Sequence, residues 1–560
     1  MPRAGQVKPP AGERLPDRIA IGLLTVTFPP ELVDRVVAET GRVQRRSRLL
    51  PARVVVYYVL AMCLFFGQGY EEVARLLSAG LLATALLILI DQPFCTISAA
   101  ASIAVAGQTV QVASGTYAEN VTPTHSGVAG SPLIFTAAPG ALVVITGKAV
   151  GSNGFTIPGK NYITIRNFTI SGTVGYGISA TSACSFLRII GNHITPAGHS
   201  TNSSTIKSAI NLDVATHSLI QNNVLDHNTS SGVYLAPGSD DDTVDHNDIS
   251  FNATRHTDSS GTYYRLAPGI DVRGASNIIS NNISHDNDDS GIQLVQDAHL
   301  NVVVNNVLYD NKDYPNSKAG DHGIDVSGAP NNTVVSNTVY GNMTAGINVE
   351  GASTGTTLAN NISVNNGLPA SPRTKGDIRV TTSAISGTVV DHDEIYMTST
   401  TGTIITWDST TFKSLAALHA RYRDVEANGF QANPNWVSPA NGDFHLTEKS
   451  PAIDSAESSA PGQLPYAQEG RVRRDDPNVV NAGAGIRSYD DRGAYEFYPM
   501  LSVGARYSRI RQNGRLHPLR PENSALAGWR GYRSPSGSWV VSHAGLAGDT
   551  GMVNNIGLTR

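Results

Sequence analysis

Aspartates recur at matching positions in two neighbouring repeats of the sequence. The segment "NNISHDNDDSGIQLV" contains Asp286 and Asp289, and the segment "NNVLYDNKDYPN" contains Asp310 and Asp313. If the repeats stack, Asp286 lies over Asp310 and Asp289 over Asp313, about 4.8 Å apart. Carboxylates that close disfavour each other's ionisation unless they face water or a cation lies among them. Because Ca²⁺ takes about six to eight oxygen ligands, calcium is the predicted ion, and solvated turn residues are the alternative.

A sequence repeat with intervals of 24 to 35 residues must position these aspartates. Each repeat has an asparagine two residues before an apolar or small position, and six repeats have a second asparagine five residues later. The first asparagines are Asn167, Asn192, Asn223, Asn247, Asn282, Asn306, Asn337 and Asn361. A small residue followed by Ile or Val completes each repeat. This pattern predicts a mainly β protein, a parallel β-helix whose coils share one apolar core. Asparagine suits its turns because it tolerates the left-handed conformation, and stacked amides form ladders.

Longer repeats insert extra residues before the Gly-Ile or Ala-Ile pair, and the insertions should leave the solenoid at one turn. Loops on one face of a solenoid commonly form its binding surface. The insertions and their surroundings supply cations and rings that suit an acidic polymer. The predicted substrate-binding residues are Tyr263, Tyr264, Arg273, Tyr314 and His322.

Composition divides the 560 residues into several parts. The predicted β-helix covers 95–400, a closing region follows at 401–499, and 1–14 and 500–560 are expected to be disordered. Residues 15–78 form a small α-helical domain, and 79–94 an apolar junction. The apolar runs at 54–67 and 76–90 are shorter than the about 20 residues that span a bilayer, so no membrane span is expected. A net charge of -5 argues against nucleic-acid binding by the whole chain.

Two stretches of sequence are similar to known families. The stretch "LPDRIAIGLLTVTFPPELVDRVVAETGRVQRRSRLLPARVVVYYVLAMCLFFGQGYEEVARLL" resembles the N-terminal domain of insertion-element transposases. The catalytic domain that follows in such transposases, with its acidic triad, has no counterpart after about residue 78. The resemblance implies common ancestry and at most weak contact with DNA, through the arginines Arg42, Arg45, Arg46, Arg48 and Arg53.

The terminal phrases "SPAIDSA" and "DDRGAYEF" are similar to those of bacterial right-handed β-helix proteins. The coils, and the phrase "YDNKD" with the later "GDHGID" in particular, resemble calcium-dependent polysaccharide lyases with this fold. The resemblance implies calcium bound by Asp286, Asp289, Asp310 and Asp313, and β-elimination on an acidic polysaccharide. It also implies a basic side chain a little after the calcium coils. The sequence departs from the family there, because the next lysine after Asp325 is Lys375. Lys312, Lys318 and Arg265 are the basic residues nearby that could take its place, and they are the predicted catalytic residues.

Several functions therefore stay open at the level of sequence. The leading hypothesis is a pectate-lyase-like protein that binds acidic polysaccharide and cleaves it with calcium. The alternatives are a non-catalytic surface protein that binds glycan, an inactive transposase remnant fused to a β-helix, and a glycoside hydrolase with paired carboxylates. The lyase resemblance implies an extracellular monomer, although residues 1–17 do not read as a signal peptide.

Overall fold

The computed structural model describes residues 93–148, 152–198, 207–253, 267–296, 298–312, 320–367 and 376–499, together with isolated shorter pieces. Within the transposase-like segment it describes four residues, Val33, Arg35, Val36 and Glu39, and all four are helical. The apolar runs lie outside the described residues, as do Arg265, Asp313, Tyr314 and Lys318. Among the described helices, none combines the length and the hydrophobicity needed to cross a membrane.

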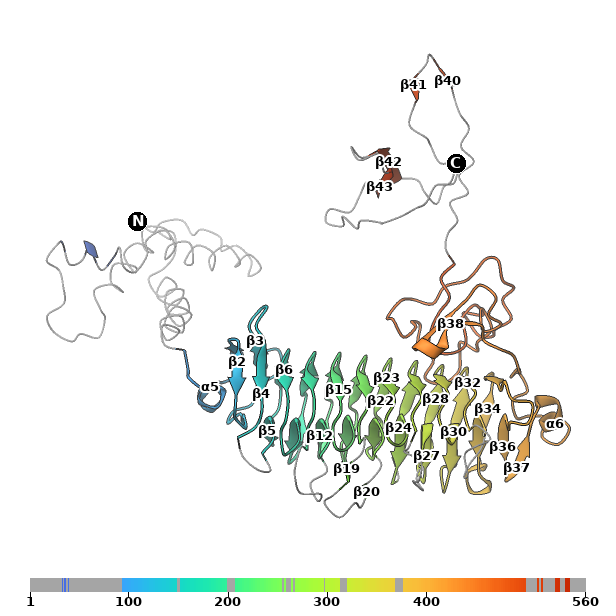
Figure 1. Ribbon diagram of the computed structural model, residues 1–560, viewed down its shortest axis with the longest axis horizontal. Coiled ribbons are helices and arrows are strands. Elements are labelled where there is room, and N and C mark those ends of the chain that lie inside the picture. Colours follow the sequence, from blue (N-terminus) through green and yellow to red (C-terminus); the bar gives the residue numbers. More distant parts are fainter. Residues whose placement is uncertain are drawn as a thin grey trace, which may run out of the picture. The chain divides into compact units, whose positions relative to one another are not determined.

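The chain divides into two units, whose helices and strands carry the labels of Figure 1. The N-terminal unit runs to Asn277 and includes Asp286–Asp289, and the C-terminal unit contains Ile278–His285, Ser290–Lys312 and the residues from Gly320 onward. In both units, successive strands of the chain enter three sheets in turn, which are named A, B and C here. The strands in each sheet are parallel, as the predicted β-helix requires.

The strands of the N-terminal unit follow one another along each sheet. Sheet A contains β1 (Thr109–Val112), β3 (Leu133–Ala137), β6 (Ile163–Arg166), β10 (Arg188–Ile190), β14 (Leu219–Gln221) and β17 (Thr243–Asp245). Sheet B contains β2 (Gly115–Tyr117), β4 (Val143–Ile145), β7 (Thr169–Ile170), β11 (His193–Ile194), β15 (Val224–Asp226) and β18 (Asp248–Ser250). Sheet C contains β5 (Phe155–Pro158), β8 (Ile178–Thr181), β12 (Ile210–Leu212), β16 (Val233–Leu235) and β21 (Ile270–Val272). Outside these sheets are the parallel pair β9 (Cys184–Ser185) and β13 (Ala215–Thr216), and the antiparallel pair β19 (His256–Thr257) and β20 (Tyr263–Tyr264).

The C-terminal unit repeats the same order. Sheet A contains β22 (Ile278–Ser280), β25 (Val302–Val304), β28 (Thr333–Val335), β31 (Thr357–Ala359) and β34 (Val389–Asp391). Sheet B contains β23 (Ile283–His285), β26 (Val307–Tyr309), β29 (Thr338–Tyr340), β32 (Ile362–Val364) and β35 (Glu394–Tyr396). Sheet C contains β24 (Ile292–Val295), β27 (His322–Ser327), β30 (Ala345–Glu350), β33 (Ile378–Val380) and β36 (Ile405–Trp407). A final strand, β37 (Thr410–Phe412), pairs with β36 in the antiparallel direction.

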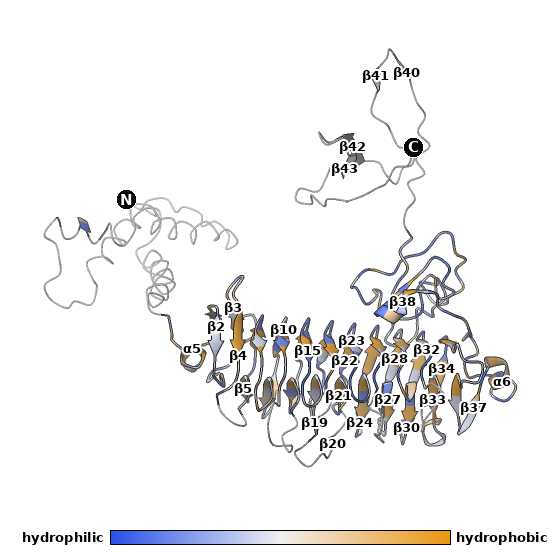
Figure 2. Cartoon of the chain, viewed as in Figure 1, coloured by the Kyte–Doolittle hydropathy of each residue, from blue (hydrophilic) through white to orange (hydrophobic). Residues whose placement is uncertain are grey.

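Alternation of side chains explains why such short strands hold together. Every second residue of a strand points into the coil, and Ile324 and Val326 of β27 are fully buried in this way. Figure 2 shows that hydrophobic residues recur along the strands of both units. The small residue of the Gly-Ile pairs is required by packing, because a Cβ on Gly323 would collide with Val339 and lie 2.7 Å from the carbonyl oxygen of Gly346. One coil alone could not bury these side chains, so stability comes from stacking.

The predicted asparagine ladders are present in both units. In the N-terminal unit, Asn223 donates from its backbone N–H and from Nδ2 to Oδ1 of Asn247, each at 2.9 Å. In the C-terminal unit, Asn337 donates in the same way to Asn361, each at 3.0 Å. These asparagines are buried, so their hydrogen bonds satisfy groups that would otherwise lose water without compensation.

Two details of the predicted ladder differ from the structure. The asparagines in the ladder do not take the left-handed conformation; the preceding residue does, for example Asn222 with φ 55° and Asp310 with φ 51°. The assignment of Asn167 to the ladder is wrong, because Oδ1 of Asn192 accepts from the backbone N–H of Phe168. Asn167 instead occupies the left-handed position, with φ 63°. Proximity of an asparagine to the expected place was therefore not enough to fix the register.

Among the residues described from 93 onward, two short helices each pack on a strand of their own unit. Helix α5 (Ile97–Ile103) packs against β1, and Glu119 accepts hydrogen bonds from the backbone N–H groups of Ile97 and Ser98. Helix α6 (Leu415–His419) packs against β37 and is capped by Ser414. Helix α6 is only five residues long, and the residues just before it form β37.

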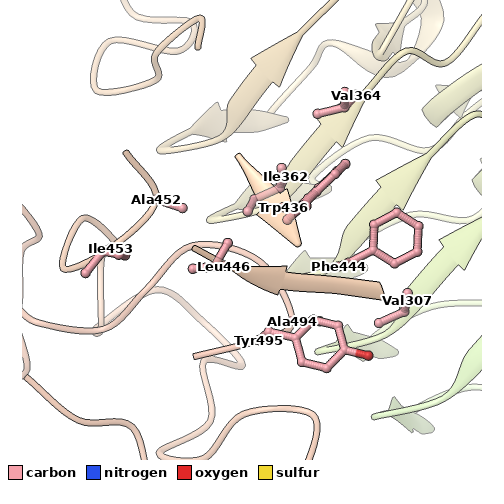
Figure 3. Close-up of a cluster of buried hydrophobic side chains, with 10 residues drawn as sticks. All are labelled: Val307, Ile362, Val364, Trp436, Phe444, Leu446, Ala452, Ile453, Ala494 and Tyr495. Carbon is pink, nitrogen blue, oxygen red and sulfur yellow. The ribbon is translucent and has the colours of Figure 1, made fainter. Parts of the chain in front are cut away.

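The closing region packs on the outer side of sheet B in the C-terminal unit. Strands β38 (Trp436–Ser438) and β39 (Asp443–Leu446) pair in the antiparallel direction, and the short 3₁₀ segment η3 (Pro439–Asn441) lies between them; a second, η2 (Thr382–Ala384), follows β33. Trp436 of β38 and Phe444 of β39 pack against Val307 and Ile362, which point outward from sheet B (Figure 3). The two terminal phrases of the sequence also meet, because the backbone N–H of Asp454 donates to Oδ1 of Asp491 at 2.7 Å. Beyond residue 500 the described strands are β40 (Arg511–Gln512) with β41 (Arg515–Leu516) and β42 (Trp529–Arg533) with β43 (Trp539–His543).

Candidate functional site

A row of polar side chains lies along the outer side of sheet C in the C-terminal unit. The strand register aligns Gln293 of β24, Asp325 of β27, Asn348 of β30 and Arg379 of β33, each between two buried apolar residues of its strand. The labelled strands β24, β27 and β30 are drawn in this order in Figure 1. Alternation along the strands therefore places one polar residue of every coil in the same line.

Direct hydrogen bonds connect the members of this row. Gln293 donates through Nε2 to Oδ2 of Asp325 at 3.0 Å, and Asn348 donates through Nδ2 to Oδ1 of Asp325 at 2.7 Å. Arg379 donates through one nitrogen, Nη1, both to Oδ1 of Asn348 at 2.6 Å and to Oε2 of Glu350 at 2.7 Å. The row thus fixes the orientation of Arg379 and, through it, of Glu350 at the end of β30.

The two carboxyl groups of this network have opposite pKa shifts. Burial raises the pKa of Asp325 to about 6; the negative charge of Glu350 adds to the shift, and hydrogen bonds from Gln293 and Asn348 oppose it. Burial would also raise the pKa of Glu350, but the hydrogen bond and charge of Arg379 lower it below its ordinary value. Neighbouring carboxyl groups whose pKa values are pushed apart are characteristic of acid and base pairs.

These residues differ in exposure, and therefore in whether a ligand can reach them. The side chain of Glu350 is 36% exposed and that of Arg379 is 19% exposed, whereas Asp325 and Asn348 are buried. Nε and Nη2 of Arg379 make no hydrogen bond within the described part of the chain. A guanidinium with two open donors recognises a carboxylate, and an ionised glutamate beside it accepts a proton or a hydroxyl group. Asp325 and Asn348 act as positioning residues behind them.

The predicted calcium ligands are distributed over both units. Asp286 and Asp289 belong to the N-terminal unit and Asp310 to the C-terminal unit. Asp286 and Asp310 each follow a strand of sheet B and are left-handed, with φ 51° for both, a conformation that aspartate tolerates at turns. Oδ1 of Asp310 lies 3.5 Å from Nζ of Lys312. Within the described residues, no three His, Cys, Asp or Glu side chains are grouped so that they could hold a metal ion. Calcium therefore stays a prediction.

The predicted catalytic and substrate-binding residues have different positions. Lys312 is exposed beside Asp310, and His322 is buried at the start of β27. Arg273 follows β21 and forms an ion pair with Asp271, with Nη2 2.9 Å from Oδ2. Tyr263 and Tyr264 are the two residues of β20, which pairs with His256–Thr257. No hydrogen bond or ion pair joins Lys312 to Arg379 or Glu350 in the described chain.

The sequence analysis missed Asp325, Asn348, Glu350 and Arg379 as site residues. A signal was available, because "GIDVS", "GINVE" and "DIRV" each place a polar or charged residue between two apolar residues of one strand. Alternation would have put Asp325, Asn348 and Arg379 on the outer side. The insertion at 368–375 precedes β33 and obscured the register of Arg379 with the other two.

Comparison with solved structures gives similarities at low identity. The chain is similar to pectate lyase Pel9A (18% identity, TM-score 0.39, covering 71% of this chain and 90% of that structure). It is similar to a rhamnogalacturonan lyase (15%, TM-score 0.38, 64% and 92%). It is also similar to the A-module of the mannuronan C-5 epimerase AlgE4 from Azotobacter vinelandii (14%, TM-score 0.38, 54% and 86%).

Sequence comparisons cover both parts of the chain. The uncharacterized protein YwoF of Bacillus subtilis (strain 168) is 26% identical over 429 residues, which is 65% of this chain and 88% of YwoF. Residues 18–110 match the family model of the insertion element 4 transposase N-terminal domain, which confirms the resemblance proposed for 15–77. Residues 89–371 match the model of the Pel9A-like right-handed β-helix region. Since this match spans half of the chain and the described coils have its architecture, the protein belongs to the Pel9A-like right-handed β-helix family.

Proposed function

We propose that this protein binds an acidic polysaccharide on the outer side of sheet C of the C-terminal unit and cleaves it by β-elimination. The observation that carries the proposal is the Asp325–Asn348–Arg379–Glu350 network, which holds an arginine with open donors beside an ionised glutamate. Membership of the Pel9A-like family supports a polysaccharide as the substrate class. We also propose that the protein acts outside the cell, because its proposed substrate is a polymeric sugar.

Each exposed residue of the network has a separate role in this proposal. Arg379 binds the carboxylate of a uronate residue through Nε and Nη2, which lowers the cost of charge developing at the neighbouring carbon. Glu350 is held by Nη1 of Arg379 and accepts the proton from that carbon. The electron pair of the broken C–H bond forms a double bond to the next carbon, and the glycosidic oxygen there leaves and takes a proton from water. Asp325 fixes Asn348, which in turn fixes Arg379, so Asp325 preserves the geometry without touching the sugar.

Calcium is the second part of the proposal. Carboxylates are the donors that Ca²⁺ prefers, and the residues proposed to hold it are Asp286, Asp289, Asp310 and Asp313. A bound calcium ion would neutralise a substrate carboxylate as a Lewis acid. Lys312, Lys318 and Arg265 stay proposed as further basic groups, and Tyr314 and His322 as sugar contacts.

The decisive experiment follows the ultraviolet absorbance of unsaturated uronate products. Purified protein is incubated with polygalacturonate, alginate or rhamnogalacturonan, each with calcium and with a chelator. We expect a rise on one of these polymers that requires calcium and is absent in Glu350→Gln. Absence of any rise, with folded protein and calcium present, would refute elimination on these substrates.

A second candidate function is hydrolysis of a glycosidic bond. The opposite pKa shifts of Asp325 and Glu350 favour it, because hydrolases use one protonated and one ionised carboxyl group. Release of reducing ends without the ultraviolet signal would establish hydrolysis. Retention of polymer without any product would favour the glycan-binding alternative, and retention of DNA would favour a residual role for the transposase-like segment.

A further inference from the structure

The outer side of sheet C in the N-terminal unit has its own row of side chains, with a different composition. The strand register aligns Ser179 of β8, Asn211 of β12, Tyr234 of β16 and Asp271 of β21. Asn211 donates through Nδ2 to Oγ of Ser179 at 3.2 Å. The row is therefore ordered by direct bonds and contains an aromatic ring in its third coil.

Two cations lie over aromatic rings on this side of the unit. Nζ of Lys207 lies 4.6 Å from the ring centre of Tyr176, and the guanidinium carbon of Arg273 lies 5.1 Å from the ring centre of Tyr234. A ring and a cation held together present an apolar face beside a charged donor. Sugars need both kinds of contact, because their C–H groups stack on rings while their hydroxyl and carboxylate groups take hydrogen bonds.

The donors of these two cations are only partly used within the protein. Arg273 donates through Nε and Nη2 to the carboxylate of Asp271, and Nη1 has no hydrogen-bond acceptor among the described residues. Nζ of Lys207 likewise has no hydrogen bond or ion pair in the described part of the chain, although its backbone N–H donates to Thr229 at 3.1 Å. Asp271 holds Arg273 in place, so Nη1 is oriented before any ligand arrives. Such preorganisation lowers the entropic cost of binding.

The spacing of the two cations fits a polymer better than a small molecule. Lys207 precedes β12 and Arg273 follows β21, two coils further along, which corresponds to about 10 Å at a strand spacing of about 4.8 Å. The tyrosine ring of Tyr234 lies in a coil between them. A chain that follows the row would meet an ammonium, a ring and a guanidinium in succession. The carboxylates of Asp271 and the exposed Asp213 repel dense negative charge, which favours a chain with separated carboxylates.

We infer that Lys207, Tyr234 and Arg273, supported by Tyr176 and Asp271, form a separate binding site for acidic polysaccharide that holds the chain without cleaving it. The inference rests on the proposed function only for the class of ligand. It does not depend on elimination at the other row, because none of these residues belongs to the Asp325–Arg379 network.

The test is retention of the full-length protein in native gels that contain polygalacturonate, alginate or neutral galactan. All proteins carry Glu350→Gln, so cleavage cannot change the gel. We expect retention by an acidic polymer, weakened about tenfold in dissociation constant by Lys207→Ala or Tyr234→Ala, in line with the loss of one charged or aromatic contact. The matched control is Arg188→Ala, which removes an exposed cation from sheet A of the same unit.

The outcomes separate this site from the proposed reaction. Retention that Lys207→Ala and Tyr234→Ala leave unchanged, or an equal effect of Arg188→Ala, would overturn the inference, and so would equal retention by neutral galactan. Lack of retention by every polymer would overturn it as well. Loss of the ultraviolet product signal in otherwise native protein concerns the proposed reaction alone, since it leaves gel retention untouched.

Discussion

In both units, the alternation of side chains along the strands of sheet C produces an outer row of residues, but the two rows carry different chemical groups. In the N-terminal unit, Tyr234 and Asp271 occupy the outward positions and cations pack over rings. In the C-terminal unit, Asp325, Asn348 and Arg379 occupy them and are linked by hydrogen bonds. The inward neighbours are Ile, Leu, Val or Ala. Burial thus constrains one side of each strand, and the other side is available for function.

The largest effect should come from breaking the C-terminal row. Glu350→Gln and Arg379→Ala are each expected to reduce product formation on the order of 10²–10⁴-fold, because they remove the proton acceptor or the group that holds it. Retention on acidic polymer should persist, because the N-terminal row is intact. The controls are Glu448→Gln and Arg423→Ala, which change exposed residues of the same unit. Equal losses in these controls would contradict the assignment.

A second substitution tests whether the C-terminal unit depends on the closing region. Nη1 of Arg473 lies 3.0 Å from Oε2 of Glu496, and both side chains are fully buried. Removing one partner leaves a buried charge, so Glu496→Gln should lower the free energy of unfolding by about 3–5 kcal/mol. Hydrogen exchange should show the loss of protection in the C-terminal unit, while the N-terminal unit stays protected. Uniform loss in both units would argue against this separation.

The pH dependence of stability should report on Asp325 in the C-terminal row. Burial raises its pKa from 3.8 to about 6, so the native state keeps a proton that the unfolded chain has released between these values. The free energy of unfolding therefore falls as the pH rises through this window, by on the order of 2–3 kcal/mol for this group. Denaturation of Asp325→Asn at several pH values should show a smaller fall than the wild type. An unchanged slope would contradict the shifted pKa.

The smallest difference is expected in the ladders. Asn223→Ala in the N-terminal unit and Asn337→Ala in the C-terminal unit each leave buried donors without an acceptor, at a cost of about 1–3 kcal/mol. Because the two sites have the same hydrogen bonds, the costs should agree closely. Urea denaturation of the two variants gives this comparison. A large difference between the two losses in free energy of unfolding would show that the ladder does not stabilise the two units equally.

The sequence allowed the coils to be predicted because their physics is local and repeated. Each strand needs two or three apolar residues at alternate positions, and each ladder position needs an asparagine, so both recur with the period. The network of Asp325, Asn348 and Arg379 was missed because it depends on register between coils separated by insertions. The packing of Trp436 and Phe444 on Val307 was equally out of reach, since nothing in the period says which sheet a distant segment covers.

The last coil of the C-terminal unit replaces the ladder asparagine with aspartate, and this has a consequence for growth of the solenoid. Oδ1 of Asp393 accepts from the backbone N–H and Nδ2 of Asn361, at 2.6 and 2.9 Å, as an asparagine would. Asp377 does the same for Asn366. The side-chain carboxylate has no N–H, so beyond Asn361 the ladder continues only through the backbone N–H of Asp393, which donates to Oε2 of Glu426 at 3.1 Å. In both ladders the aspartate therefore removes one side-chain hydrogen bond that a further coil would need, which weakens the tendency of a one-dimensional, repetitive fold to add coils.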